Sequence, residues 1–564
     1  MARTASAGGH ARDRRESRKT LAIDAGMTHG RKQARDTADD DEALMDPNPI
    51  WAQADDAAIQ RDFGRAERLY RQALSLQTGH VPSLIGLSNL KSELGQHRSA
   101  HRLALQAWQA KPEHPALLYA LAQRLRYFCE YEKLVECLGR PAFASQAPVD
   151  VLARGVVMLS SIGAQTEAMA LARHAVQREP RNATALYVLG NQQLFLGETA
   201  LAESCYEASL AADPKLFQNS WMLAGARPQT AESNHVARLH EQLRQARPGG
   251  EGETYLYYAL HKELHDIGDY EAAWQALDQA CSARRALIQY EPAEDVALAD
   301  AMIGLCTPDF LKAAAGTTRL PSTPIFIVGM HRSGTTLLER MLSGHSDIGD
   351  AGETAAFDAA MHWATDHFAS GGQPDLESVK RARGADYQAV AERYAESARW
   401  LSRGKPWFTE KLPMNFWNVG FIAKALPQAR VINLVRDPVA TCFSNLRTFF
   451  AGVARYSYRQ DELAAFYLQY RRVMAHWSQV LPGTVLNVEY QRLVDDPDGT
   501  IREVAEFCGF DYQPAQVDVA RSGGRIATAS AALARSGIVK DRGEIWRHYA
   551  HHLQPLIDGL RSVR

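Results

Sequence analysis

The segment PIFIVGMHRSGTTLLERML, residues 324–342, carries the strongest fold signal in the chain. Its first part, PIFIVG, is a short run rich in β-branched and aromatic residues, which is typical of a buried strand. Its last part, TTLLERML, has the apolar spacing of an amphipathic helix. Between them lies the turn GMHRSGTT, residues 329–336. A glycine-containing turn between a strand and a helix N-terminus presents backbone N–H groups to an anion, so we expect a phosphate-binding loop here.

The turn differs from the nucleotide-triphosphate loop GxxxxGK[ST] at one decisive position. It keeps two glycines and the hydroxyl of Thr336, but Thr335 stands where the lysine belongs. Phosphoryl transfer relies on that lysine and on a bound magnesium ion. Arg332 supplies the cation instead. A phosphoryl-transferring kinase or nucleotidase is therefore the disfavoured alternative.

The run resembles the 5′-phosphosulfate loop of sulfotransferases that use 3′-phosphoadenylyl sulfate, whose pattern is close to PRSGTT. His331 replaces the proline of that pattern. The resemblance implies an α/β domain with a central parallel sheet across about residues 321–549. It also implies that the donor is held by Arg332, Ser333, Gly334, Thr335 and Thr336, with no metal required.

A second segment, ARVINLVRDPVATCFSNL at residues 429–446, supplies a candidate for the other end of the donor. It predicts a strand over 431–434 and a helix that Pro438 opens at its first turn. In the sulfotransferase family, an arginine at a strand end and a serine eight residues later clamp the 3′-phosphate. Arg436 and Ser444 have that spacing, and a guanidinium can fork onto two phosphate oxygens.

Two further segments resemble the catalytic residues of tyrosylprotein-type sulfotransferases. Glu353, in DAGETAAF at residues 350–357, matches the glutamate that serves as general base. Lys411, in KPWFTEKLPMNFWNV at residues 405–419, matches the lysine that stabilises the leaving oxygen, as Arg332 stabilises the sulfuryl group. Neighbouring Glu410 would orient this lysine. The alternatives are a solvated helix-cap carboxylate for Glu353 and a solvated surface amine for Lys411.

Three further assignments rest on the resemblance alone. Tyr490, in VEYQRLV, matches a family position near the adenine or the donor phosphate, with simple packing as the alternative. Ser530, with Thr528 as a near equivalent, matches a family serine on the sulfate side. Lys540, or Arg542, matches a basic group that reaches the 3′-phosphate.

The N-terminal half has an internal period of 34 residues, which resembles that of tetratricopeptide proteins with their antiparallel helix pairs. Glycines at 95, 163 and 197 are expected to end first helices, and prolines at 112, 180 and 214 to stop second helices. Five repeats fit, and a sixth pair over 256–280 is offset after an interruption near 217–252. The positions that follow the period are Ala66, Ala100, Leu134, Ala168 and Ala202.

The chain of 564 residues is thus interpreted as multidomain. We expect a disordered tail over 1–45, an all-α tetratricopeptide solenoid over 46–216, and an irregular helical region with a further repeat-like pair over 217–316. A P-loop-type α/β sulfotransferase domain follows over 317–564. An insertion of helical character between 354 and 403 would cap the acceptor side.

Composition narrows the functional classes. The 63 Lys and Arg residues nearly balance the 65 Asp and Glu residues, which gives no reason to expect nucleic acid or an anionic membrane as a partner. Seven widely spaced cysteines lack the CxxC spacing of a zinc site, and we expect buried thiols. No long apolar run predicts a membrane span or a signal peptide, so a cytoplasmic protein is expected.

The leading hypothesis is an enzyme that moves the sulfuryl group of 3′-phosphoadenylyl sulfate to an acceptor hydroxyl. The resemblance favours a protein or peptide tyrosine as acceptor, engaged by the solenoid. Glycan, lipid and small phenol hydroxyls remain alternative acceptors. A homodimer is an open alternative for the oligomeric state. A third alternative is a non-catalytic repeat adaptor with a relict donor domain.

Overall fold

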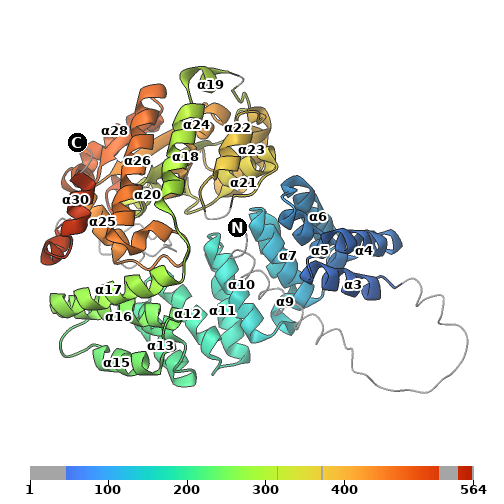
Figure 1. The fold of residues 1–564 in the computed structure, drawn as a ribbon, viewed down its shortest axis with the longest axis horizontal. Coiled ribbons are helices and arrows are strands. Elements are labelled where there is room, and N and C mark those ends of the chain that lie inside the picture. The colour runs from blue at the N-terminus through green and yellow to red at the C-terminus, as the bar shows by residue number, and fades with distance from the viewer. Residues whose placement is uncertain (1–45, 314, 370–371, 520–543, 562–564) are drawn as a thin grey trace, which may run out of the picture. The chain divides into compact units, whose positions relative to one another are not determined.

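Helices dominate the N-terminal half of the chain (Figure 1). A parallel sheet organises the described part of the C-terminal half. The computed structural model describes residues 46–313, 315–369, 372–519 and 544–561. These residues form two compact units. Unit 1 comprises the described residues up to Leu159 together with Asp366–Phe368, and unit 2 comprises Ser160–Thr365 and the described residues from Ala369 onward.

Unit 1 is built from helices joined by short turns. They are α3 (Asn48–Ile59), α4 (Phe63–Leu76), α5 (Val81–Glu93), α6 (His97–Gln109), α7 (Pro115–Tyr127), α8 (Tyr131–Leu138), α9 (Pro141–Gln146) and α10 (Val149–Ser161), whose last residues already belong to unit 2.

Unit 2 begins with further helices of the same kind. They are α11 (Gln165–Arg178), α12 (Ala183–Leu196), α13 (Thr199–Ala212), α14 (Phe217–Ala226), α15 (Val236–Gln245), α16 (Glu251–Asp266), α17 (Tyr270–Ala286), α18 (Pro292–Leu305) and α19 (Pro308–Lys312).

The predicted tetratricopeptide-type helix pairs are confirmed. The second helices α4, α6, α8, α11 and α13 begin at residues 63, 97, 131, 165 and 199, so each start lies 34 residues after the one before. All five periodic positions lie in these helices and are fully buried, and the alanine at four of them lets neighbouring helices approach closely. The break in the period is also present, since α14 and α15 stand between the fifth pair and the pair α16–α17.

The turns inside the pairs share one backbone conformation. Gly95, Gly163 and Gly197 have φ values of 70°, 78° and 85°, in the left-handed region that glycine adopts without strain. Arg61 and Cys129 lie at the same step of 34 residues and have φ values of 63° and 57°. The repeat geometry therefore imposes this conformation even where the sequence lacks the glycine that would signal it.

In the described part of unit 2, the sheet has five parallel strands in the order β2-β3-β1-β4-β5, which confirms the expected central parallel sheet. In the register, Ile327 of β1 lies opposite Lys411 of β3, and Gly329 of β1 lies opposite Leu434 of β4. The strands are β1 (Thr323–Gly329), β2 (Ile348–Asp350), β3 (Trp407–Lys411), β4 (Arg430–Val435) and β5 (Val485–Glu489).

Helices follow each strand, as parallel connections require. They are α20 (Thr335–Ser343), α21 (Ala356–Thr365), α22 (Leu376–Ala382), α23 (Tyr387–Leu401), η1 (Pro413–Asn418), α24 (Val419–Ala425), α25 (Pro438–Leu446), η2 (Arg455–Tyr458), α26 (Gln460–Val480), α27 (Tyr490–Asp495), α28 (Pro497–Cys508), η3 (Pro514–Gln516), η5 (Ile545–Tyr549) and α30 (Gln554–Arg561).

The helical insertion between β2 and β3 consists of α21, α22 and α23, as predicted. Phe357 of α21 and Tyr394 of α23 are fully buried, and both rings contact Phe326 of β1. Phe357 and Tyr394 therefore form core rather than an acceptor-reading surface.

Helices α16–α18 pack directly on the sheet-containing part of unit 2. Tyr258 of α16 donates a hydrogen bond to the Leu446 carbonyl at the end of α25, at 3.1 Å. Arg285 of α17 forms a two-nitrogen ion pair with Glu462 of α26, with a closest contact of 2.9 Å. Among the described helices, none combines the length and the apolar character needed to cross a membrane.

Candidate active site

The phosphate-binding turn joins β1, which ends at Gly329, to α20, which begins at Thr335. Gly334 is the N-cap of α20 with φ of 107°, and among the described residues no side chain caps the first turn of this helix. The N–H groups of that turn therefore remain available to an anion. The Ser333 hydroxyl is buried and has no hydrogen-bond partner among the described residues.

Both glycines of the turn are required by close neighbours. A Cβ on Gly334 would lie 2.5 Å from the Tyr490 ring, and a Cβ on Gly329 would lie 2.8 Å from the Leu434 carbonyl oxygen. These contacts are shorter than any side-chain carbon tolerates, so only glycine lets β4 and Tyr490 approach the turn. Tyr490 thus begins α27 as a buried wall of the turn.

The predicted 3′-phosphate residues lie beside the turn. Arg332 donates from Nε to the Ser444 hydroxyl at 3.2 Å, and Arg436 donates to the Arg332 carbonyl at 3.2 Å. The Arg436 guanidinium carbon lies 4.6 Å from the centre of the Tyr490 ring, in cation–π geometry. The structure therefore brings together four of the predicted donor residues from β4, α25, α27 and the turn.

The start of α25 fixes the position of these groups. Asp437 caps the helix by accepting from the Ala440 N–H at 2.7 Å, and Pro438 occupies the first helical turn. Asn445, on the same helix as Ser444, donates to the His331 carbonyl at 2.7 Å. The helix is thus hydrogen-bonded to the turn at two points, and Asn445 is a site-forming residue that sequence reasoning missed.

His331, which replaces the family proline, is buried and hydrogen-bonded to the Tyr456 hydroxyl at 2.7 Å from Nδ1. Burial lowers the pKa of His331 to about 4, with nearby Lys411 and Arg332 acting in the same direction and Glu353 opposing them. The imidazole is therefore neutral near pH 7 and adds no charge to the turn.

Lys411 and Glu353 form an ion pair at the ends of adjacent strands β3 and β2. The lysine is fully buried, whereas the Glu353 side chain is 47% exposed. Burial opposes ionisation of Glu353, but the charge and hydrogen bond of Lys411 outweigh it, so the pKa of Glu353 is lowered. The carboxylate is therefore ionised at neutral pH, in a position that solvent reaches.

A second carboxyl group, Glu339 of α20, lies 3.9 Å from the Lys411 nitrogen. It accepts a hydrogen bond from the Thr409 hydroxyl at 3.3 Å. Burial raises the pKa of Glu339 to about 7, although Lys411 lowers it. The sequence showed Glu339 only as a charge within the apolar run of an amphipathic helix, so its place beside the lysine was missed.

Glu410 does not orient Lys411, contrary to the expectation from its position in sequence. Successive strand residues point to opposite faces of a sheet, and Glu410 accepts hydrogen bonds from Tyr394 at 2.7 Å and Asn415 at 3.5 Å instead. Burial raises the pKa of Glu410 to about 8. This carboxyl group belongs to the core beneath the helical insertion.

The remaining predicted residues divide into two groups. Ser333, Thr335 and Thr336 lie in the turn or the first turn of α20, as the sequence predicts. Ser530 and Lys540 lie outside the described residues. All seven cysteines are free thiols, of which five are buried and Cys129 and Cys205 are half-buried.

Comparison with known proteins places this geometry in a family context. Residues 324–514 match the model of the Sulfotransferase family. An uncharacterized protein of Aquifex aeolicus is 27% identical over 402 residues, which cover 70% of this chain and 52% of that protein. The chain thus spans about half the length of that relative.

Two other similar proteins match smaller shares of the chain. A putative protein-tyrosine sulfotransferase of Caenorhabditis briggsae is 28% identical over 194 residues, covering 33% of this chain and 66% of that protein. The solved sulfotransferase domain from the Synechococcus PCC 7002 olefin synthase is 21% identical, covers 41% of this chain and 90% of its own, and has a TM-score of 0.31. The match to the Sulfotransferase family lies in the part of the chain that follows the helical repeats.

Proposed function

We propose that this protein transfers the sulfuryl group of 3′-phosphoadenylyl sulfate to an acceptor hydroxyl, with Glu353 as general base and Lys411 on the leaving oxygen. The observation that carries this proposal is the Lys411–Glu353 ion pair, which stands close enough to Arg332 of the anion-binding turn for the charge of that arginine to act on Glu353. The family of the domain supports sulfuryl transfer as the reaction class.

The residues at the turn fit the proposed donor. Among the described residues, the N-terminus of α20 has no side-chain cap and the Ser333 hydroxyl has no partner, so both can offer hydrogen bonds to the 5′-phosphosulfate, with Thr335 and Thr336 nearby. Arg436 and Ser444 would hold the 3′-phosphate, and Tyr490 backs the guanidinium. Ser530 and Lys540 are proposed as further donor contacts. When bound, the donor supplies an activated sulfur with a phosphate leaving group.

The protein's own groups account for the proton and the developing charge. As the acceptor oxygen forms its bond to sulfur, Glu353 takes the hydroxyl proton. The bond from sulfur to the bridging oxygen breaks, and Lys411 stabilises the negative charge that this oxygen acquires. Arg332 stabilises the sulfuryl oxygens. The reaction is thus balanced without a metal or a covalent enzyme intermediate.

The ion pair also implies that Lys411 exchanges Glu353 for the leaving oxygen as its charge partner during the reaction. While Lys411 holds Glu353, the low pKa of the carboxylate makes it a weak base. A negatively charged leaving oxygen would compete for the ammonium group, and release of Glu353 would raise its basicity. Glu339, 3.9 Å from the lysine nitrogen, remains to keep Lys411 in place during this exchange.

A peptide or protein tyrosine is the proposed acceptor. The name of the Caenorhabditis relative supports this choice, and tetratricopeptide-type helix pairs are a common scaffold for peptide binding. The partial exposure of Glu353 supports access by a large acceptor rather than by a small enclosed one.

The proposal is tested with the full chain, a sulfur-labelled donor and separate pools of tyrosine peptides, glycans and small phenols. We expect label on tyrosine peptides with the wild type and none above background with Arg332→Ala or Glu353→Gln. Glu377→Gln, which alters an exposed ion pair with Arg381 on α22, is the matched control and should be fully active. Transfer that persists in both site variants, or tighter binding of ATP–Mg²⁺ than of 3′,5′-adenosine bisphosphate, contradicts the proposal.

A further inference from the structure

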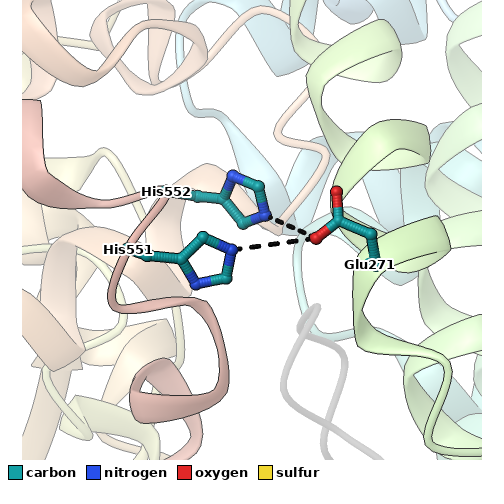
Figure 2. Close-up of side chains that lie close together, drawn as sticks. All are labelled: Glu271, His551 and His552. Carbon is teal, nitrogen blue, oxygen red and sulfur yellow. Dashed lines mark hydrogen bonds and ion pairs between the residues drawn. The ribbon is translucent and has the colours of Figure 1, made fainter.

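Away from the candidate active site, three side chains of metal-binding type meet at the contact between α17 and the segment that follows η5 (Figure 2). Glu271 lies in the first turn of α17, and His551 and His552 lie just before α30. The Nε2 atoms of His551 and His552 are 3.7 Å and 3.0 Å from the same carboxylate oxygen of Glu271. One ligand atom from each residue lies within 4.8 Å of the other two.

These spacings are those of ligands around one small ion. Zinc binds imidazole nitrogen and carboxylate oxygen at about 2.0–2.2 Å, so two tetrahedral ligands of one zinc ion stand about 3.3–3.5 Å apart. The separations of 3.7 Å and 3.0 Å from Glu271 to His551 and His552 fall on either side of that value. Small side-chain rotations would therefore bring all three atoms into contact with a single ion. Figure 2 shows both imidazoles directed at the carboxylate from the opposite side of the gap.

The side chains around the cluster hold it in position. The His552 ring stacks on Trp274, one turn after Glu271 on α17, with ring centres 4.6 Å apart and planes 5° from parallel. The backbone carbonyl of His552 accepts a hydrogen bond from Gln460 at 3.0 Å. Next to it, the fully buried Tyr549 is hydrogen-bonded to His265 of α16 at 2.8 Å. The ligand pair is thus anchored to α16, α17 and α26 before any ion binds, which lowers the cost of ordering the site.

We propose that Glu271, His551 and His552 bind one divalent transition-metal ion, with zinc as the best fit, and that water completes the coordination. Two imidazoles and one carboxylate suit zinc, cobalt or nickel, whereas magnesium and calcium prefer all-oxygen sites. Glu271 and His551 are largely exposed, so an ion can enter from solvent and retain a water ligand. The ion would fasten the C-terminal segment of the chain to the last repeat-like helix pair.

This role is independent of the proposed sulfuryl transfer, because it concerns the contact between α17 and the C-terminal segment and uses none of the active-site residues. Without an ion, Glu271 can simply accept an N–H bond from each imidazole. The two interpretations share the same side-chain arrangement, and direct metal binding separates them.

The test uses untagged full-length protein, from which metal has been removed, titrated with Co²⁺ and then with Zn²⁺. We expect one equivalent of Co²⁺ to give the visible absorption of a four- or five-coordinate site and to be displaced by Zn²⁺. His551→Gln and His552→Gln should each weaken Zn²⁺ binding at least tenfold, and the double variant should remove the absorption.

The control is His548→Gln, which removes an imidazole stacked on Tyr270 in the same segment but leaves the three ligands intact. It should bind Zn²⁺ as the wild type does. Zn²⁺ should also raise the thermal unfolding midpoint of the wild type and of this control, but not that of the double variant. Equal Zn²⁺ affinity in the wild type and the double variant, or no stoichiometric binding by the wild type, overturns the proposal.

Discussion

Lys411 and Glu353 form an ion pair although 58 residues separate them in the chain. Strand β3 ends at Lys411, and its N–H donates to the Gly352 carbonyl at 3.0 Å, next to Glu353. The parallel pairing of β2 with β3 therefore places the two side chains at the same edge of the sheet. The hydrogen bond from the Lys411 N–H holds the two backbone segments together beside the ion pair, so the contact does not depend on side-chain conformation alone.

Replacement of Lys411 by alanine should lower kcat for sulfuryl transfer by about 10²–10³-fold, the usual effect of removing one group that stabilises transition-state charge. The binding of 3′,5′-adenosine bisphosphate should change much less, because Arg436, Ser444 and the turn remain. Steady-state kinetics and calorimetry measure the two quantities. Lys405→Ala, which removes a hydrogen bond to the Ile348 carbonyl near the start of β3, is the control and should retain activity. An equal loss of affinity and kcat in Lys411→Ala would contradict a role on the leaving oxygen.

Replacement of Arg436 by alanine should weaken binding of 3′,5′-adenosine bisphosphate by about 10–100-fold, as expected for hydrogen bonds between charged groups. Adenosine 5′-phosphate lacks the 3′-phosphate, so its affinity should barely change. Arg436→Lys should bind 3′,5′-adenosine bisphosphate more tightly than Arg436→Ala but more weakly than the wild type, because a lysine keeps the charge but loses the planar fork. Calorimetry with both nucleotides measures the difference. Arg472→Ala, at a surface ion pair with Asp300, is the control. An equal effect on both nucleotides would place Arg436 elsewhere than at the 3′-phosphate.

Replacement of Gly334 by alanine should abolish donor binding and destabilise unit 2. The new Cβ would lie 2.5 Å from the Tyr490 ring, and the φ of 107° is strained for any residue with a side chain. Each such strain costs about 1–3 kcal/mol. Gly304→Ala is a sharp control, because Gly304 lies in α18 with no atom within 4 Å of the added carbon. That substitution should stabilise the helix by about 0.5–1 kcal/mol. Thermal unfolding and nucleotide binding distinguish the two variants.

The parts of this structure that sequence predicted are those with local signals. The 34-residue step predicted five antiparallel helix pairs, and the strand-turn-helix pattern predicted β1 and α20, because these signals lie in the residues that form the elements. The orientation of Glu410 could also have been predicted locally. Successive residues of β3 alternate between the two faces of the sheet, so Glu410 and Lys411 point in opposite directions. Their adjacency in the sequence had suggested a contact between them instead.

Contacts that depend on the order of the strands in the sheet could not be predicted from the sequence. The hydrogen bond from Arg332 to Ser444 spans 112 residues, and the approach of Glu339 to Lys411 depends on how α20 lies against β3. These features arise from packing between distant segments, which no local pattern encodes.

Replacement of Glu410 by glutamine should make the stability of unit 2 less sensitive to pH. Burial raises the pKa of Glu410 to about 8, from a value near 4.5 in the unfolded chain. Between these two values the folded protein holds a proton that the unfolded chain has lost, so the free energy of unfolding falls as pH rises through this window. The slope is at most about 1.4 kcal/mol per pH unit for one proton.

Glutamine keeps the shape of the protonated acid and cannot ionise, so Glu410→Gln should gain stability over the wild type as pH rises from 5 to 8.5. Thermal unfolding midpoints of both proteins across this range measure the gain. Burial also raises the pKa of Asp358, to about 6. Asp358→Asn should therefore gain stability over the wild type at lower pH than Glu410→Gln does. Glu377→Gln on the exposed face of α22 is the control with no such trend. A constant difference between Glu410→Gln and the wild type at every pH would mean that Glu410 is already ionised in the fold, with Tyr394 and Asn415 stabilising the charge rather than the proton.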